Sequence, residues 1–195
     1  RSPARPEAAA RATVIVGATV LDGTGAPGQM VNVRIEGDRI AAMGAAAPAR
    51  GDAVIDGSGL VLAPGFIDTH SHGDDQIRDH PDALAAPSQG ITTIVVGQDG
   101  GSYRPLETFF RRLERRPAAV NVASYAGHGT IREKVMGDDF RRHATASEIA
   151  KMQKLLEKEM RAGAIGLGSG LEYDPGIDSA PEEVVALAKT AASFG

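Results

Sequence analysis

The 195-residue sequence contains no cysteine, so the chain forms no disulfide bond and offers no thiolate ligand to a metal ion. It also lacks any apolar run near the ~20 residues that a membrane-spanning helix needs, so we expect no membrane partner. Neither sign of charge dominates, because the formal net charge is only −4. A balance of this kind does not predict binding to nucleic acid or to another polyanion. The chain is 42% hydrophobic, which is enough to bury a real core.

The start of the chain bears on its compartment. Arg1 stands where a methionine would begin a primary product, so we expect that a segment was removed, and this expectation favours a periplasmic or secreted protein slightly over a cytoplasmic one. The absence of cysteine fits every compartment and does not choose one. Residues 1–11 are rich in Ala, Pro and Arg and have no periodicity, so we expect a disordered segment or a linker.

Residues 12–62 are predicted to form a small β domain. Apolar and polar residues alternate over 31–35 and again over 39–43, and Gly37-Asp38 separates the two runs. This pattern is typical of a β-hairpin. Further short strands are predicted at 12–16, 18–21, 54–55 and 60–62.

From Pro64 onward, β-type segments alternate with helical ones, which predicts a parallel sheet covered by helices. Thr145 and Glu148 have the spacing of a capping box, and Gly163 is the expected stop of the helix that follows. The expected strands are 65–70, 91–96, 120–125 and 164–168. The expected helices are a short one within 81–88, one over 106–115, one between the capping box and Gly163, and one from Pro181 to Gly195.

Two histidines close the first strand of this parallel region. His70 and His72 are separated by one residue, so in a strand they point the same way, about 6.5–7 Å apart along the chain. Asp68 shares their face. Imidazole nitrogen is a common zinc ligand, and a catalytic zinc keeps one position open for water. The pair is therefore predicted to bind one ion, and the alternative is two surface histidines at a strand end.

Four segments carry a resemblance to a known family. Residues 63–72, Ala-Pro-Gly-Phe-Ile-Asp-Thr-His-Ser-His, resemble the first barrel strand of the amidohydrolase superfamily. Residues 90–97, 127–130 and 163–176 resemble its D-aminoacylase branch, the last of them most specifically. The likeness extends from about Val14 to the end of the chain.

The resemblance implies a fold. It is the first half of a (β/α)₈ TIM-like barrel preceded by a small β-sandwich domain. A barrel of this type takes about 250 residues, so residues 63–195 are expected to hold only its first four β/α units. A second chain or a C-terminal part would then complete both the barrel and the composite sandwich.

Polar residues follow every predicted barrel strand, where the active site of such a barrel lies. Glu172 follows the fourth strand, and by its position it is predicted to bridge two metal ions or to complete a mononuclear site. The alternative is a surface glutamate at the start of a loop. Other members of the superfamily often bridge their metals with a carbamylated lysine, but the fourth strand and its exit loop contain no lysine.

Asp99 departs from the pattern of the D-aminoacylases, which have a cysteine ligand at this loop position. Oxygen in place of sulfur makes the site harder and weakens its preference for zinc relative to manganese or cobalt. Either Asp99 keeps the ligand role, or Glu172 bridges the metals and Asp99 lies behind the ligands. An ordinary turn residue in an Asp-Gly pair is the remaining alternative. We expect one or two Zn²⁺ ions, with Mn or Co as alternatives.

Two residues are candidates for contact with substrate. His128 lies between two glycines after the third strand, where it either bonds a substrate carbonyl or carboxylate or satisfies a loop carbonyl. Tyr173 is assigned to substrate only by similarity with a tyrosine in the family's pocket.

The resemblance also implies a reaction, the metal-dependent hydrolysis of the amide bond of N-acyl-D-amino acids or related amides. A bound ion lowers the pKa of water towards ~7 and polarises the scissile carbonyl. The family's general acid/base, an aspartate after the eighth strand, would lie outside this chain. The alternatives are a cyclic-amide or dipeptide hydrolase of the same superfamily and a non-catalytic scaffold subunit. The expected partners are a small acylated amino acid and a second chain carrying the rest of the barrel.

Overall fold

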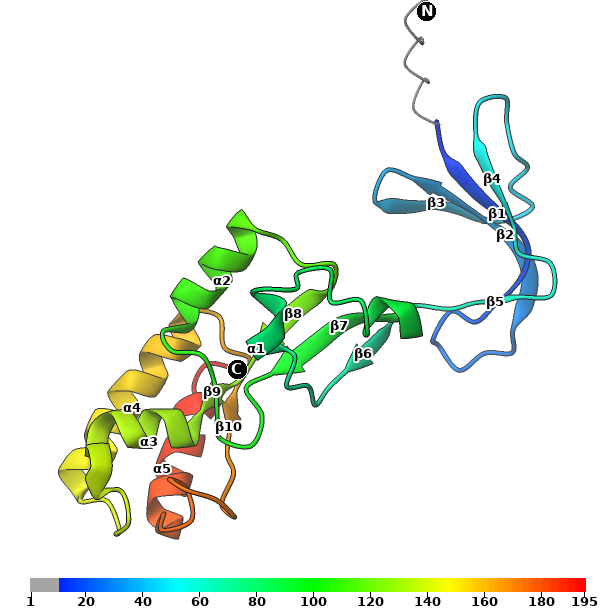
Figure 1. Ribbon diagram of the computed structural model, residues 1–195. Coiled ribbons are helices and arrows are strands. Elements are labelled where there is room, and N and C mark those ends of the chain that lie inside the picture. The colour runs from blue at the N-terminus through cyan, green and yellow to red at the C-terminus, as the bar shows by residue number, and fades with distance from the viewer. Residues whose placement is uncertain (1–10) are drawn as a thin grey trace, which may run out of the picture. The chain divides into compact units, whose positions relative to one another are not determined.

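The computed structural model describes residues 11–195, which have a mixed α/β architecture (Figure 1). The chain divides into two compact units, Arg1–Pro64 and Gly65–Gly195. The linker predicted at 1–11 lies outside the described residues except for Arg11. In the described part of the chain, no helix combines the length and the apolar character needed to cross a membrane.

The first unit is a five-stranded sheet built around its first strand. Its members are β1 (Thr13–Val20), β2 (Gln29–Glu36), β3 (Arg39–Gly44), β4 (Ala53–Asp56) and β5 (Val61–Leu62). β1 pairs antiparallel with β2 and parallel with β4 and β5, while β2 and β3 form the predicted hairpin. The alternating residues Val14, Ala18 and Val20 are buried, as expected for a sheet with one covered face.

The second unit is organised around parallel strands. They are β6 (Phe66–Asp68), β7 (Ile91–Val96), β8 (Asn121–Ser124), β9 (Ala126–Gly127) and β10 (Leu167–Gly168). β7 lies between β6 and β8, and β10 pairs with β9. Ile165 donates a backbone hydrogen bond to Ser124, which joins the two ladders in chain order. β7 matches its prediction, whereas β6 and β10 are shorter than predicted.

Helices connect these strands. They are α1 (Asp74–Ile77), α2 (Leu106–Arg115), α3 (His128–Met136), α4 (Ala146–Arg161) and α5 (Pro181–Ala192), with 3₁₀ turns η1 (Pro87–Gln89) and η2 (Gly137–Asp139). The capping box of α4 is confirmed, since Thr145 and Glu148 each accept the other's backbone N–H. Gly163 follows this helix with φ +108°, a conformation that suits glycine.

The helix predictions differ from the structure at several places. The short helix expected within 81–88 is replaced by turns, because Pro81 and Pro87 both lack the backbone N–H that a continuous helix uses. α5 ends at Ala192 and not at Gly195. α3 was not predicted at all, because its glycine-flanked start favours a loop.

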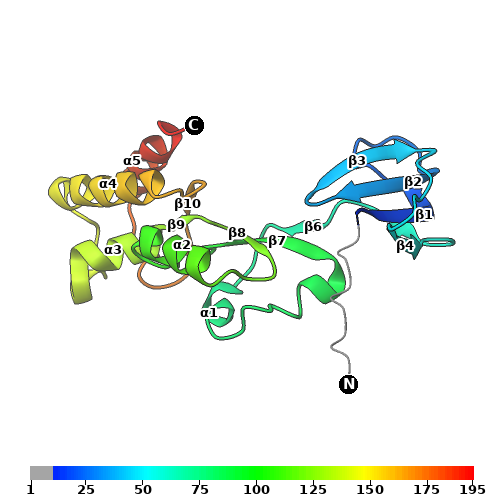
Figure 2. The same cartoon turned by 90° about the horizontal axis from the view of Figure 1, so that it is seen from above.

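The core of the second unit lies between these helices and the sheet. Met152, Leu156 and Met160 of α4 are buried in one cluster with Leu106 of α2 and Leu187 of α5. Full burial of each such side chain contributes about 1.5–3 kcal/mol. Figures 1 and 2 show α4 beside α5, close to the short β9 and β10. This packing places α4 against β9 and α5 against β10.

Candidate metal centre

The two histidines lie just beyond the end of β6. The Asp68 carboxylate accepts a hydrogen bond from the backbone N–H of His70 at 3.2 Å, which shapes the turn out of the strand. The rings of His70 and His72 meet edge to face, with centroids 5.4 Å apart and planes at 61°. The two rings therefore lie close together, and both histidines lie beyond β6, which ends at Asp68 and not at His70. Their role as metal ligands stays a prediction.

Asp99, after β7, completes a three-residue cluster. Its Oδ2 atom lies 3.3 Å from Nε2 of His70 and 3.2 Å from Nε2 of His72. Within residues 11–195, these three form the one group of at least three His, Cys, Asp or Glu side chains whose ligand atoms all lie within 4.8 Å of one another. A tetrahedral zinc with ligands at 2.0–2.2 Å separates neighbouring ligand atoms by about 3.3–3.6 Å. The observed spacing therefore fits a shared ion.

The backbone holds Asp99 in an unusual conformation. Its φ is +56°, which aspartate tolerates better than most residues, and Gly97 and Gly100 on either side also have positive φ. A Cβ atom on Gly97 would lie 2.4 Å from the carbonyl oxygen of Tyr125. A Cβ atom on Gly100 would lie 3.0 Å from the backbone nitrogen of Gly170. The loop therefore packs closely between the residues that follow β8 and those that follow β10. This packing fixes the direction of the Asp99 carboxylate.

Glu172 is exposed and lies outside this three-residue cluster. Of the two carboxylates considered as ligands, Asp99 is the one that meets the histidines. The role of Glu172 as a bridge stays a prediction.

A cavity of about 690 Å³ adjoins the cluster. Besides His72 and Asp99, its wall includes Tyr173, the residue predicted to contact substrate. Asp74 and Asp75, which sequence reasoning did not single out, also line it, and their position directly after the His-x-His segment was the available signal. Burial raises the pKa of Asp74, a shift that the nearby His72 partly opposes. The cavity therefore has an acidic wall beside the histidines.

His128 is fully buried at the first position of α3. Its Nδ1 atom lies 2.9 Å from the Ser169 hydroxyl, and its Nε2 atom lies 2.8 Å from Oε1 of Glu183. Both ring nitrogens are therefore engaged within the chain. This geometry leaves neither ring nitrogen free for a substrate. The substrate contact of His128 stays a prediction that the structure does not support.

Glu183 also pairs with Arg132, and both side chains are fully buried. Burial by itself raises the pKa of the Glu183 carboxyl, but hydrogen bonds from His128 and Arg132 outweigh it, so the pKa falls below its usual value. The carboxylate is therefore ionised at neutral pH. Sequence reasoning missed this pair.

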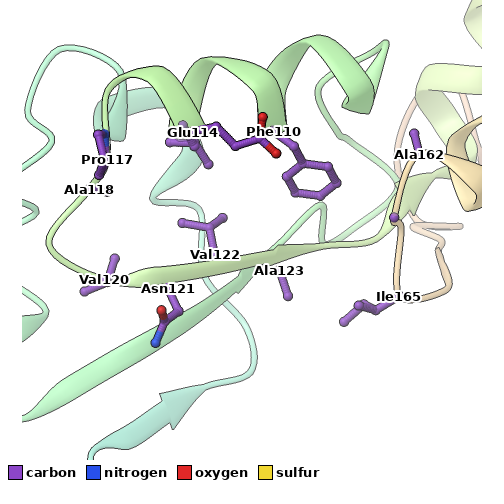
Figure 3. A pocket seen from close by; sticks show the side chains of 12 residues that line it. Phe110, Glu114, Pro117, Ala118, Val120, Asn121, Val122, Ala123, Ala162 and Ile165 are labelled. Atoms are coloured by element: carbon purple, nitrogen blue, oxygen red, sulfur yellow. The ribbon is translucent and has the colours of Figure 1, made fainter. Parts of the chain in front are cut away.

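A second large hollow, of about 720 Å³, is apolar and lies elsewhere in the unit. Figure 3 shows the side chain of Phe110 in α2 pointing toward β8, which carries Val122 and Ala123, and Ile165 below that strand. None of the predicted site residues is in its wall. The titratable cluster, and not this hollow, is the candidate site.

Three comparisons bear on this geometry. Residues 53–194 match the model of the Amidohydrolase family. The N-acyl-D-aspartate deacylase of Alcaligenes xylosoxydans xylosoxydans is 41% identical, and the match covers 88% of this chain and 39% of the relative. The D-aminoacylase of the same organism is 37% identical, with 93% of this chain and 42% of the relative covered. The chain therefore spans about two fifths of the length of these curated relatives.

Solved structures of deacylases are similar to this chain as well. The N-acyl-D-glutamate deacylase of Bordetella bronchiseptica, complexed with zinc and a phosphonate inhibitor, has a TM-score of 0.87 at 35% identity. That match covers 94% of this chain and 43% of the other. A D-aminoacylase with a binuclear metal centre gives a TM-score of 0.85 at 37% identity, with the same shares covered.

Proposed function

This chain belongs to the amidohydrolase family, and we propose that it is the N-terminal part of a metal-dependent enzyme that hydrolyses the amide bond of N-acyl-D-amino acids. The observation that carries the proposal is the convergence of His70, His72 and Asp99 at 3.2–3.3 Å. The 41% and 37% identical relatives named for deacylation of D-amino acids support the substrate class.

The proposal includes the architecture of the whole enzyme. The strands β6 to β10 and their helices are the first four β/α units of a (β/α)₈ barrel, whose active site lies at the carboxyl ends of the strands. The sheet β1–β5 is part of a composite β-sandwich. A further part of the polypeptide or a second chain supplies the remaining units, including the general acid/base.

The metal would be held by Nε2 of His70, Nε2 of His72 and a carboxylate oxygen of Asp99, with Glu172 as a further candidate ligand. Zinc is the first choice, and the oxygen of Asp99 also suits manganese or cobalt. A zinc ion supplies a bound water of lowered pKa and polarises a carbonyl.

The side chains of this chain then have separate tasks. Asp68 orients the backbone at His70, and the close packing of the glycine-rich loop 97–101 fixes the position of Asp99. Tyr173 lines the adjoining cavity and would position the substrate.

The test is metal analysis combined with an activity screen of the full-length enzyme on paired D- and L-acyl amino acids. His70→Asn and His72→Asn should each lose bound metal and activity together. His143→Asn, which changes an exposed histidine elsewhere, should lose neither. Equal turnover of both enantiomers would remove the D-specific proposal. Full metal content in both histidine variants would remove the metal site.

A further inference from the structure

A network of hydrogen-bonded polar side chains lies near the candidate site, and the proposed hydrolysis gives it no role. It runs from Ser169 at the exit of β10 through His128 to Glu183 and Arg132. The last three side chains are fully buried, whereas Ser169 is exposed. Arg132 also donates to the backbone carbonyls of Phe140 and Asp178. The Arg132 end of the network is therefore held in place.

Charge balance determines where the ring proton of His128 lies in this network. The negative charge of Glu183 is already matched by Arg132, so a protonated His128 would add a second buried cation without a counter-ion. Such a charge is costly, which makes the neutral imidazole the stable form. An ionised carboxylate only accepts hydrogen bonds, so the single N–H of His128 must be on Nε2, facing Glu183. Nδ1 is then an acceptor.

The direction of the Ser169 hydroxyl follows from this. A hydroxyl carries one hydrogen, and at 2.9 Å from an accepting Nδ1 that hydrogen points inward to His128. Only lone pairs remain for any group that approaches from outside. Ser169 is thus an obligate hydrogen-bond acceptor.

Ser169 precedes Gly170, and the backbone of Gly170 packs against the loop that carries Asp99. A Cβ atom on its neighbour Gly170 would lie 2.2 Å from the backbone oxygen of Asp99 and 2.8 Å from the ring of Tyr173. The loop that carries Ser169 therefore packs on the residue that meets both histidines and on a residue of the cavity wall.

We propose that Ser169 is a substrate-binding residue that accepts a hydrogen bond from the N–H of the scissile amide, with His128 and Glu183 as positioning residues that orient its hydroxyl. The inference rests on the proposed function. The scissile carbonyl and the carboxylate of an N-acyl amino acid are acceptors, and the amide N–H is the one donor of its backbone. An acceptor-only hydroxyl on the loop that packs against Asp99 matches that donor.

The test compares an N-acyl-D-amino acid with its ester isostere, the O-acyl-D-2-hydroxy acid, which lacks the N–H. In the full-length enzyme, Ser169→Ala should lower kcat/KM for the amide about tenfold and leave the ester nearly unchanged. Ser193→Ala, at an exposed serine after α5, is the matched control and should change neither. An equal loss on both substrates would overturn the assignment, since it would indicate a purely structural serine.

A second measurement is independent of turnover. Nitrogen-15 NMR of labelled histidine in the full-length enzyme should give His128 a protonated Nε2 and an unprotonated Nδ1, and the Nδ1 signal should move in Ser169→Ala. A doubly protonated ring would reverse the hydroxyl and overturn the proposal. If the enzyme cleaves neither substrate, the proposed function fails and the substrate role of Ser169 fails with it. The NMR result still decides the direction of the hydroxyl.

Discussion

At the level of single residues, Asp99 controls which ion the candidate centre prefers. We predict that Asp99→Cys in the full-length enzyme raises the ratio of bound zinc to bound manganese, because thiolate is the softer ligand. Competitive loading followed by elemental analysis measures that ratio. Asp38→Cys, whose parent side chain is 90% exposed, introduces a thiol away from the cluster and should leave the ratio unchanged. An unchanged ratio in both variants would exclude Asp99 as a ligand.

The buried pair of Arg132 and Glu183 governs stability at the same scale. We predict that Arg132→Met lowers the free energy of unfolding by about 3–5 kcal/mol, because it leaves a carboxylate buried without its cation. Urea unfolding of the full-length enzyme measures the loss. Arg141→Met, at an exposed pair with Asp174, should cost far less, because water screens that pair. Adding Glu183→Gln to Arg132→Met should restore part of the loss, and no restoration would contradict the pairing.

The sequence predicts some of these residues and not others, for a reason of distance. His70 and His72 are two residues apart on one segment, so their convergence is a local property. Glu183 is 55 residues from His128 and 51 from Arg132, and each acid or base looks like an ordinary helix charge. The choice between Asp99 and Glu172 likewise depended on which loop folds over the histidines, which position along the chain does not reveal.

At the level of secondary-structure elements, α2 depends on α4 for its N-terminal cap. Pro105 precedes α2 and offers no side-chain cap, and the buried Glu159 of α4 accepts the backbone N–H of Leu106 at 2.7 Å. We predict that Glu159→Ala lowers the free energy of unfolding by about 2 kcal/mol, since the N–H is left buried without a partner. Glu159→Gln keeps an acceptor and should lose less. Equal losses in chemical unfolding would argue against the cap.

The start of α4 is predicted to be sensitive to acid. Hydrogen bonds from Arg142, and then from the backbone and hydroxyl of Thr145, hold the pKa of Glu148 well below its usual range. A lowered folded-state pKa stabilises the fold above the unfolded value, about 4.3, and this contribution is lost as the pH falls through the lower folded value. Glu148→Gln should therefore reduce the urea midpoint at pH 7 and have little effect in strong acid. Glu182→Gln, at an exposed glutamate, is the control, and a loss independent of pH would contradict the assignment.

Elements with local signals were predicted and elements held by distant contacts were not. β7 and α2 match their predicted ranges, and α4 has its predicted cap, because an apolar run, a helical period and a capping box are each complete within a few residues. α3 begins with His128 and Gly129, which disfavour a helix by propensity. Its start is held by the contacts of the buried His128, and these come from Ser169, just after β10, and from Glu183 of α5.

At the level of the whole molecule, the second unit has two unpaired edges. In the described part of the chain, β6 pairs with β7 alone and β10 with β9 alone. Phe66 and Ile67 of β6 are 64% and 62% exposed, which is unusual for large apolar residues of a sheet. A closed barrel has no such edges. This is the feature that an extra set of strands would cover.

We therefore predict that the 195-residue chain alone is not a stable monomer, because bare strand edges and exposed apolar side chains favour association. Light scattering after size exclusion under native conditions should give oligomers or aggregates. Ile67→Lys, on β6, should reduce this association without restoring a compact fold, and Lys154→Glu on the outer side of α4 should not reduce it. Co-expression with the remaining part of the enzyme should give one defined assembly. A well-folded particle at 20.2 kDa would contradict the prediction and remove the need for further barrel strands.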